Sequence, residues 1–212
     1  MHKLTRPTPP ACLGRYMHGR DHRRSVTSAH KSEIWLKIDE MQQLRCAYCE
    51  AEIKTSKEDS NSHIEHFRQR SRHPADTFRW NNMFGSCNRE DSCGKHKDRQ
   101  PVYPHLDLIK MDVEDPDRYL FFLPDGNVAA KKGLNPREKT RAEETIRLFN
   151  LNGSLRQIRE TMIKGYLQTA EEFAEMAAEF SPEDWQPLVE EELAAIEHLP
   201  FATAIKHVLL PE

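Results

Sequence analysis

The stretch CAYCE, residues 46–50, places the thiols of Cys46 and Cys49 two residues apart, which is the spacing of a metal knuckle. A second pair, Cys87 and Cys93, begins 38 residues after Cys49. Four thiolates from two pairs suit a tetrahedral Zn²⁺ ion and leave no coordination position open for chemistry, so we predict a structural zinc site. The alternatives are a redox-active CxxC pair or four buried cysteines that bind no metal.

The composition explains why such an ion would matter. Hydrophobic residues make up 37% of the 212 residues and charged residues 31%, so we expect only a modest core. A structural zinc contributes roughly 10–16 kcal/mol of apparent binding free energy, whereas a small domain is stable by about 5–15 kcal/mol. The metal would therefore decide whether this chain folds.

The cysteine count and the lack of apolar runs bear on the cellular compartment. There are five cysteines, and we find neither an apolar signal segment nor a run long enough to span a membrane. An odd count without a signal argues against a disulfide framework, and Cys12, outside both pairs, is expected to be a plain thiol. We expect a cytoplasmic protein.

Charge is divided unevenly along the chain. Residues 1–110 contain 20 Lys and Arg against 14 Asp and Glu, whereas residues 111–212 contain 11 against 20. The basic first half suits a polyanionic partner such as nucleic acid, and the acidic second half does not. Solvated helix faces are the plain alternative for the acidic half.

Periodicity and turn residues predict an α+β fold. A helix is expected from Ser32, a strand over SHIEHF (62–67), and a helix starting within WNNMFGSCN (80–88). Later elements are a hairpin over 118–130 with its turn at 124–127, a helix starting at Asn135, a long helix over about 154–180 and another after Ser181. The expected regions are an extended, Pro-rich basic arm (1–31), a zinc-stabilised core (32–110), a hairpin and helix (111–153) and an acidic helical tail (154–212).

Between the cysteine pairs, NSHIEHFRQRSR (residues 61–72) brings together His63, Glu65 and His66 and then becomes strongly basic. On a strand, His63 and Glu65 share one face and His66 points to the other. A neutral imidazole, with an ordinary pKa of about 6.5, can act as a general base near neutral pH, and we predict that role for His66. His63 is expected to be a solvent-facing strand residue or a supporting partner.

The order of these motifs resembles that of the HNH nucleases, whose ββα-metal motif is held together by a zinc ion between two cysteine pairs. The likeness spans about residues 44–98. Glu65-His66 matches the acid–His pair, Asn82 the central asparagine and His96 the last histidine. The resemblance implies a small zinc-stabilised ββα-metal core, followed here by a mainly helical C-terminal region.

The resemblance also implies roles for these residues in phosphodiester hydrolysis. Glu65 and His96 would hold a catalytic Mg²⁺ or Mn²⁺, with water and the phosphate as the remaining ligands. Asn82 would pin the loop that carries His66 through backbone hydrogen bonds. In the family the last ligand usually follows the final cysteine directly, where this chain has Gly94, and Asn88 is a rival to His96.

Basic residues flank the predicted base and the last predicted ligand, which suits contacts to nucleic-acid phosphates. Arg can hold phosphate oxygens in a bidentate manner. A solvated charged loop is the plain alternative for any one of them. The predicted nucleic-acid-binding residues are Arg68, Arg70, Arg72, Arg79, Lys95 and Lys97, with Arg99 close to them.

Several stretches narrow the resemblance to the PtuB-type HNH subunit of Septu and retron antiphage systems. They are KLTRPTPPACL (3–13), HIEHFRQRS (63–71), SCNREDSCGKHK (86–97) and GLNPREKTRAEETIRLFNLN (133–152). This branch implies a defence effector that works beside a PtuA-type ATPase subunit, docked through the N-terminal arm or the C-terminal helices. Packing of the tail on the chain's own core is the alternative.

Two functions follow from these expectations. One is a metal-dependent endonuclease, with DNA as the family's usual substrate and RNA, including tRNA, as the other choice. The other is a non-catalytic, zinc-stapled nucleic-acid-binding or scaffold subunit of the same complex. A binding module needs only the cysteines and the arginines, so the two functions differ at His66.

Overall fold

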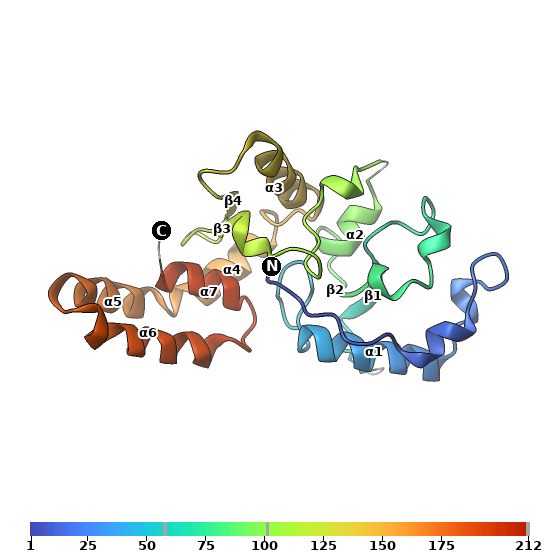
Figure 1. The fold of residues 1–212 in the computed structure, drawn as a ribbon, viewed down its shortest axis with the longest axis horizontal. Coiled ribbons are helices and arrows are strands. Elements are labelled where there is room, and N and C mark those ends of the chain that lie inside the picture. The colour runs from blue at the N-terminus through green and yellow to red at the C-terminus, as the bar shows by residue number, and fades with distance from the viewer. Residues whose placement is uncertain (57–58, 101, 211–212) are drawn as a thin grey trace.

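A computed structural model describes residues 1–56, 59–100 and 102–210 of the chain. Over those residues the protein is α+β, as predicted, with seven α-helices and two two-stranded antiparallel sheets. The molecule is elongated (Figure 1): the first sheet lies with α1 and α2 at one end, and the α5–α6 hairpin projects from the other.

The N-terminal arm packs on the rest of the chain. Residues 1–10 lack regular structure and are followed by 3-10 turns at Ala11–Arg15 and Arg23–Ser25. Leu4 is buried, and its backbone N–H donates to the carbonyl of Met111 at 2.9 Å. Arg6 donates to the carbonyl of Trp80 at 2.7 Å. Of the extended arm predicted over residues 1–31, only residues 1–10 and the stretches after the two turns lack helical structure, and α1 already begins at Ser28.

Helix α1, Ser28–Gln42, begins four residues before the predicted start at Ser32. Thr27 explains the earlier start, because its side chain accepts a hydrogen bond from the backbone N–H of His30, which satisfies an otherwise unpaired helix-end donor. The helix buries Ile34, Ile38 and Met41.

The first sheet pairs β1, Ser62–His66, with β2, Met83–Cys87, in antiparallel register, with Glu65 opposite Phe84. The short helix α2, Cys93–Asp98, packs on β2. The predicted strand at SHIEHF is confirmed. The predicted helix in WNNMFGSCN was wrong: Trp80–Asn82 form a 3-10 turn and the rest is β2. All five β2 residues are buried, and periodicity cannot distinguish such a strand from a buried helix.

The second sheet is the predicted hairpin. Strands β3, Leu120–Phe122, and β4, Val128–Ala130, are antiparallel, and the turn between them contains Gly126 at a φ of 81°. Helix α3, Pro136–Leu148, starts where predicted, and Asn135 and Glu138 form a reciprocal capping box.

The C-terminal region contains four helices rather than the predicted long helix and one more. They are α4 (Leu155–Lys164), α5 (Leu167–Glu179), α6 (Pro182–Ile196) and α7 (Ala202–Leu209). The predicted helix over 154–180 is broken at Gly165 and Tyr166, and α6 follows Ser181 as expected. The break separates α4, which buries Leu155 and Ile163, from α5, which has no buried residue.

The predicted tail is therefore two kinds of structure. Leu155 and Ile163 of α4 and Phe201 and Val208 of the α7 segment belong to the same hydrophobic core as the paired cysteines. Helices α5 and α6 form the outlying hairpin. Phe180, between them, is 57% exposed, and Leu188 of α6 is 46% exposed. Helices α5 and α6 also pack on α7, where Ile196 is buried against Ile205 and Leu209, but Phe180 and Leu188 remain in solvent.

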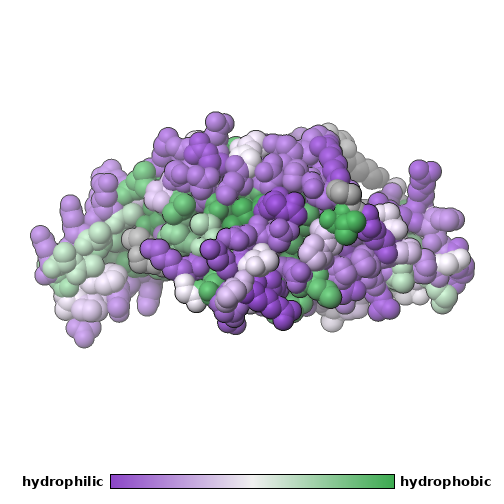
Figure 2. All heavy atoms as spheres, turned by 90° about the horizontal axis from the view of Figure 1, so that it is seen from above, coloured by the Kyte–Doolittle hydropathy of each residue, from purple (hydrophilic) through white to green (hydrophobic). Residues whose placement is uncertain are grey.

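The surface is mainly hydrophilic. Figure 2, seen from above, shows hydrophilic side chains over most of this face, with hydrophobic ones at scattered places. No helix in the described residues is both long and apolar enough to cross a membrane.

Candidate functional site

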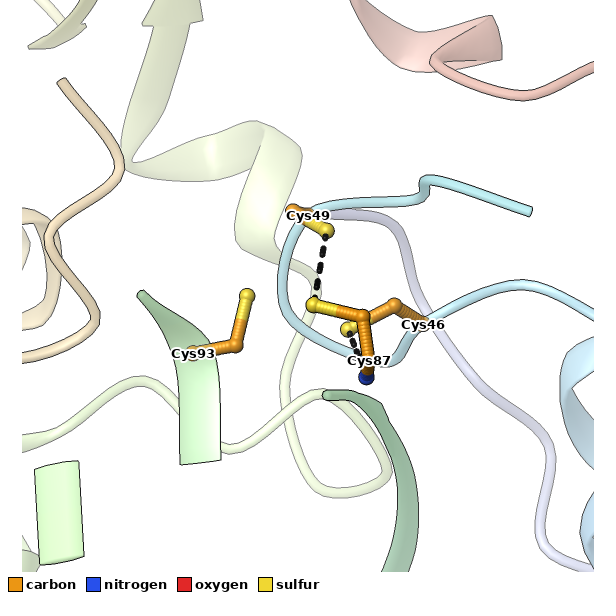
Figure 3. A group of neighbouring side chains, drawn as sticks. All are labelled: Cys46, Cys49, Cys87 and Cys93. Atoms are coloured by element: carbon orange, nitrogen blue, oxygen red, sulfur yellow. Dashed lines mark hydrogen bonds between the residues drawn. The ribbon is translucent and has the colours of Figure 1, made fainter. Parts of the chain in front are cut away.

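The four paired cysteines meet in the interior. Cys46 and Cys49 come from the loop after α1, Cys87 ends β2, and Cys93 begins α2. All four side chains are buried, and their Sγ atoms lie within 4.8 Å of one another. Figure 3 shows the four side chains converging from these segments. The prediction that the two pairs form one group is confirmed.

The geometry of this group fits zinc. With Zn–S bonds of about 2.3 Å, tetrahedral coordination places the sulfurs about 3.8 Å apart. The Sγ atoms of Cys49 and Cys87 are 4.0 Å apart, and the backbone N–H of Cys87 donates to Cys46 Sγ at 3.4 Å. All five cysteines are free thiols in the structure, so the group is not committed to a disulfide. Four buried cysteines so close together could hold a metal ion such as zinc.

The electrostatics around the sulfurs favour thiolate character at one of them and provide a counter-charge. Burial opposes ionisation of Cys46, but hydrogen bonds from the other three thiols bring the pKa of Cys46 well below its ordinary value. Arg159 of α4 is fully buried nearby; burial lowers the pKa of Arg159, and the neighbouring Cys49, Glu50 and Cys93 oppose that shift. A zinc tetrathiolate carries net negative charge, which this guanidinium would offset.

Sequence reasoning did not find Arg159. It lies in the tail, 66 residues after Cys93, and nothing in its local sequence distinguishes it from the other arginines of the chain. Its guanidinium also donates to the carbonyls of Gly126 and Leu151, so it ties α4 to the second sheet and to the loop before it.

Glu65 faces the interior beside a lysine. It is 2% exposed, accepts a hydrogen bond from the hydroxyl of Tyr48 and forms an ion pair with the ammonium of Lys97. Burial raises the pKa of Glu65, and the charge of Lys97 opposes that rise. Burial alone would lower the pKa of Lys97, but Glu65, Tyr103 and Asp98 outweigh it and the pKa is raised. The predicted nucleic-acid contact at Lys97 was wrong, because that side chain is 0% exposed.

His66, at the end of β1, points to the opposite side of the strand. Its Nε2 lies 3.0 Å from the backbone carbonyl of Thr77. A carbonyl only accepts, so Nε2 carries the hydrogen and Nδ1 of the neutral ring keeps a free lone pair. Burial, followed by the charges of Arg70, Arg23 and Lys97, lowers the pKa of His66 to about 3, although the hydrogen bond with Thr77 opposes the shift. The ring is therefore neutral at neutral pH.

Asn82 holds the loop that follows His66. Its Oδ1 accepts from the backbone N–H of Arg68 at 2.7 Å, and its Nδ2 donates to the carbonyls of Arg68 and Asp76, each at 3.2 Å. The predicted pinning of this loop through backbone hydrogen bonds is confirmed. The loop in turn carries Thr77, whose carbonyl orients His66.

The remaining predicted ligands point elsewhere. His96 Nδ1 lies 2.8 Å from the carbonyl of Leu148, and Asn88 Oδ1 lies 2.9 Å from Nδ1 of His63. A side chain at Gly94 would collide with the side chain of Glu65, so this position has no room for a ligand residue in this arrangement. Over residues 1–56, 59–100 and 102–210, the only group of three or more His, Cys, Asp or Glu placed to share an ion is the cysteine group.

Most of the predicted phosphate-binding residues are paired with carboxylates. Arg68 and Arg79 both contact Asp76, at 3.2 and 3.1 Å. Lys95 and Arg99 both pair with Glu90. The exceptions are Arg70 and Arg72, which are exposed and form no ion pair within the described part of the chain. Arg23, which sequence reasoning placed only in the arm, is the unexpected cation near His66.

No protein-family model matches the chain, and a comparison with curated proteins finds no match either. The site is therefore interpreted from its own geometry and from the sequence resemblance.

Proposed function

We propose that this chain is an HNH-type endonuclease that hydrolyses nucleic-acid phosphodiester bonds. DNA is the favoured substrate, and RNA, including tRNA, is the second choice. The observation that carries the proposal is His66: a neutral imidazole, fixed by the carbonyl of Thr77, with its Nδ1 lone pair free and two arginines nearby.

The surrounding fold supports this proposal. Strands β1 and β2 are antiparallel, α2 packs on β2, and four cysteines that could hold zinc lie at the junction of these elements. This is the arrangement that the resemblance to HNH nucleases implies, with Asn82 holding the loop beyond the base.

In the proposed reaction, Nδ1 of His66 accepts a proton from a water molecule. The water oxygen forms a bond to phosphorus while the bond from phosphorus to the leaving oxygen breaks, and solvent supplies the proton for that oxygen. The hydrogen on Nε2 stays with the carbonyl of Thr77, which stabilises the imidazolium that forms. The low pKa of His66 keeps the ring neutral over the whole neutral range, and it also makes Nδ1 a weaker base than an ordinary imidazole.

The two metals of the proposal differ in how well the residues fit them. Cys46, Cys49, Cys87 and Cys93 fit a structural zinc, which supplies a cross-link and no reaction chemistry. Glu65 and His96 do not fit a catalytic Mg²⁺ or Mn²⁺ as they are arranged, because Glu65 is paired with Lys97 and His96 contacts the carbonyl of Leu148. A catalytic cation would have to displace the ammonium of Lys97 from Glu65.

The proposed setting is an antiphage defence complex with a PtuA-type ATPase subunit. Of the two predicted docking segments, the arm packs on the chain's own core, whereas the α5–α6 hairpin projects into solvent (Figure 1). The exposed side chains of Phe180 and Leu188 on that hairpin support the C-terminal helices as the docking surface.

A second candidate is a non-catalytic, zinc-stapled nucleic-acid-binding subunit of the same complex. Two observations favour it: His66 is only 5% exposed, and Glu65 faces a lysine rather than an open cation site. In this case the basic side chains on the surface would bind the nucleic acid, and His66 would only stabilise the loop that follows β1.

The test is a cleavage assay on the full chain, purified with any partner that accompanies it. Plasmid, single-stranded DNA and total RNA are incubated with Mg²⁺, with Mn²⁺ and with EDTA. His66→Ala should lower cleavage about 10²- to 10⁴-fold, while zinc content stays at the wild-type level and the chain keeps a cooperative melting transition. His198→Ala, which removes an exposed histidine of the tail, is the matched control. Equal cleavage by His66→Ala and wild type would overturn the proposal and favour the binding subunit.

A further inference from the structure

The N-terminal segment, residues 18–25, lies beside the loop that follows β1 (Figure 1). Two adjoining hollows separate them. Residues 18–25 line one side of these hollows, and Arg70, Pro74 and Thr77 line the other. The segment is thus not a free arm at this point but one wall of a surface depression.

The unpaired charges around this depression are of one sign. Arg23, Arg24 and Arg70 have no hydrogen-bonding or ion-pair partner among the residues that the structure describes. Arg20 is different, since it pairs with Asp21 at 2.8 Å. The other nearby carboxylate, Asp98, lies beside Arg70 but pairs with Lys97 at 3.0 Å.

Arg23 and Arg70 are close enough to disfavour each other. Burial lowers the pKa of Arg23, and the charge of Arg70 lowers it further. Two guanidinium groups held together without a carboxylate repel each other, and an anion between them relieves that repulsion. The arrangement has the charge pattern of a site for an anionic ligand.

The depression adjoins His66. Thr77, whose carbonyl fixes His66 Nε2, lines the same hollow as Arg23 and Arg70. An anion held by the two arginines would therefore lie beside Thr77, the residue that orients the proposed base.

We infer that Arg23 and Arg70 form a phosphate clamp that holds a backbone phosphate of a nucleic acid beside His66. This inference rests on the proposed function, because the ligand is the substrate of that site. Guanidinium groups bind phosphate oxygens in a bidentate manner, which fixes the position of the phosphate as well as its charge. The clamp joins two segments that are 47 residues apart in sequence, so it forms only in the folded chain.

The test measures binding apart from cleavage. Fluorescence anisotropy of a labelled 30-nucleotide DNA, its duplex and an RNA of the same sequence is recorded with the full chain in EDTA, and a gel verifies that the probe stays intact. Arg23→Gln and Arg70→Gln should each weaken binding about ten-fold, and each should reduce the slope of log K against log salt by about 0.7 for single strands or 0.9 for duplex. The variant that carries both Arg23→Gln and Arg70→Gln should show the sum of the two losses in binding free energy and in salt slope.

Arg137→Gln, at an exposed position of α3 with no side-chain partner in the described residues, is the matched control and should leave binding unchanged. Arg23→Lys and Arg70→Lys keep the positive charge but lose the forked guanidinium that binds phosphate in a bidentate manner. They should show the wild-type slope of log K against log salt but only part of the wild-type affinity. Melting curves and zinc content identify any glutamine variant that fails to fold. The lysine variant at the same position then replaces it in the binding assay.

Equal binding by the glutamine double variant and Arg137→Gln would overturn the clamp, and so would a wild-type chain that binds none of the three probes at low salt. The result also separates the two proposals. Binding that depends on Arg23 and Arg70 in a chain that never cleaves would support the clamp and overturn the endonuclease. Undiminished cleavage by the variant that carries both glutamine substitutions would support the endonuclease and overturn the clamp.

Discussion

The two sides of strand β1 treat charge in opposite ways. On one side, the carboxylate of Glu65 is buried against Lys97 and Tyr48, and opposite charges are brought together. On the other side, His66 is neutral and lies near Arg23 and Arg70, which have no carboxylate partner among the described residues. Glu65 thus faces a buried ion pair, which we call the closed side of β1. His66 faces the unpaired cations Arg23 and Arg70, which we call the open side.

This difference separates structural charge from functional charge. A buried ion pair that satisfies itself stabilises the fold only if both partners remain, because removing one leaves an isolated charge. Unpaired cations that repel each other at a surface depression do not stabilise the fold and are available for a ligand. Loss of the metal should affect both sides of β1, whereas substitutions at Lys97, Asn82 or His66 should each affect one side.

The largest effect is expected from loss of the metal, which removes the frame of both sides. Cys87 ends β2 and Cys93 starts α2, so the strand and the helix around β1 lose their common anchor. Zinc at a site of this kind contributes roughly 10–16 kcal/mol, so a strong chelator should abolish the cooperative melting transition seen by circular dichroism. Cys46→Ser should do the same.

Cys12→Ser is the control for this experiment, because Cys12 is buried outside the cysteine group. It should retain one zinc per chain by elemental analysis. A melting curve that is unchanged by chelator, or a purified chain with no bound metal, would contradict the structural zinc.

The next effect is expected on the closed side. Lys97→Met leaves Glu65 buried without its counter-charge and should lower the free energy of unfolding by about 3–5 kcal/mol in a urea titration. Lys97→Met combined with Glu65→Gln removes both charges and should recover much of that loss. If the double variant is no more stable than Lys97→Met alone, the lysine acts through its other contacts, to the carbonyls of His66 and Phe67, and not through Glu65.

A smaller effect is expected on the open side from Asn82→Ala. The substitution removes the three hydrogen bonds to the backbone of Arg68 and Asp76 and leaves the N–H of Arg68 without its acceptor. We expect a loss of about 1–3 kcal/mol in unfolding free energy. Asn81→Ala, at the exposed neighbouring position, should change it little. Faster hydrogen exchange confined to the loop 67–77 would locate the effect, and unchanged exchange there would contradict it.

An effect of similar size is expected from pH. Because burial and nearby cations hold the pKa of His66 at about 3 in the folded chain, the unfolded chain binds a proton that the folded chain does not at intermediate pH. The stability that depends on neutral His66 is complete above the unfolded pKa of about 6.5 and is lost as the pH falls toward about 3. Between pH 7 and pH 5 this amounts to about 2 kcal/mol.

Urea titrations at several pH values check this. Because other groups titrate in the same range, the measured quantity is the difference between wild type and His66→Gln, which cannot take up this proton. The two curves should converge as the pH falls. Parallel curves between pH 7 and pH 5 would show that His66 ionises freely in the folded chain.

Local patterns predicted those parts of the molecule that local interactions build. The knuckle around Cys46 and Cys49, the strand over 62–67, the hairpin turn at 124–127 and the capping box at Asn135 all depend on residues a few positions apart. In each case the backbone conformation follows from side chains that contact it within one turn or one strand.

The features that were missed depend on contacts between distant segments. β2 was predicted as a helix because its burial by α1 and β1 erases any period in its sequence. Arg23 acts near His66, 43 residues away, and Arg159 lies near a cysteine group that ends at Cys93. The closed side was also missed, since no spacing rule pairs Glu65 with Lys97 across the space between β1 and α2.

Helix α7 contacts the loop that carries Cys46 and Cys49. Glu50, directly after Cys49, accepts hydrogen bonds from the backbone N–H and hydroxyl of Thr203 in α7, 153 residues later. The ribosome must therefore synthesise α7 before the knuckle can complete its contacts, and closing so long a loop costs entropy before these bonds form. A nascent chain halted in α5 would lack these contacts, so we expect the loop around Cys49 to be completed only after α7 has been synthesised.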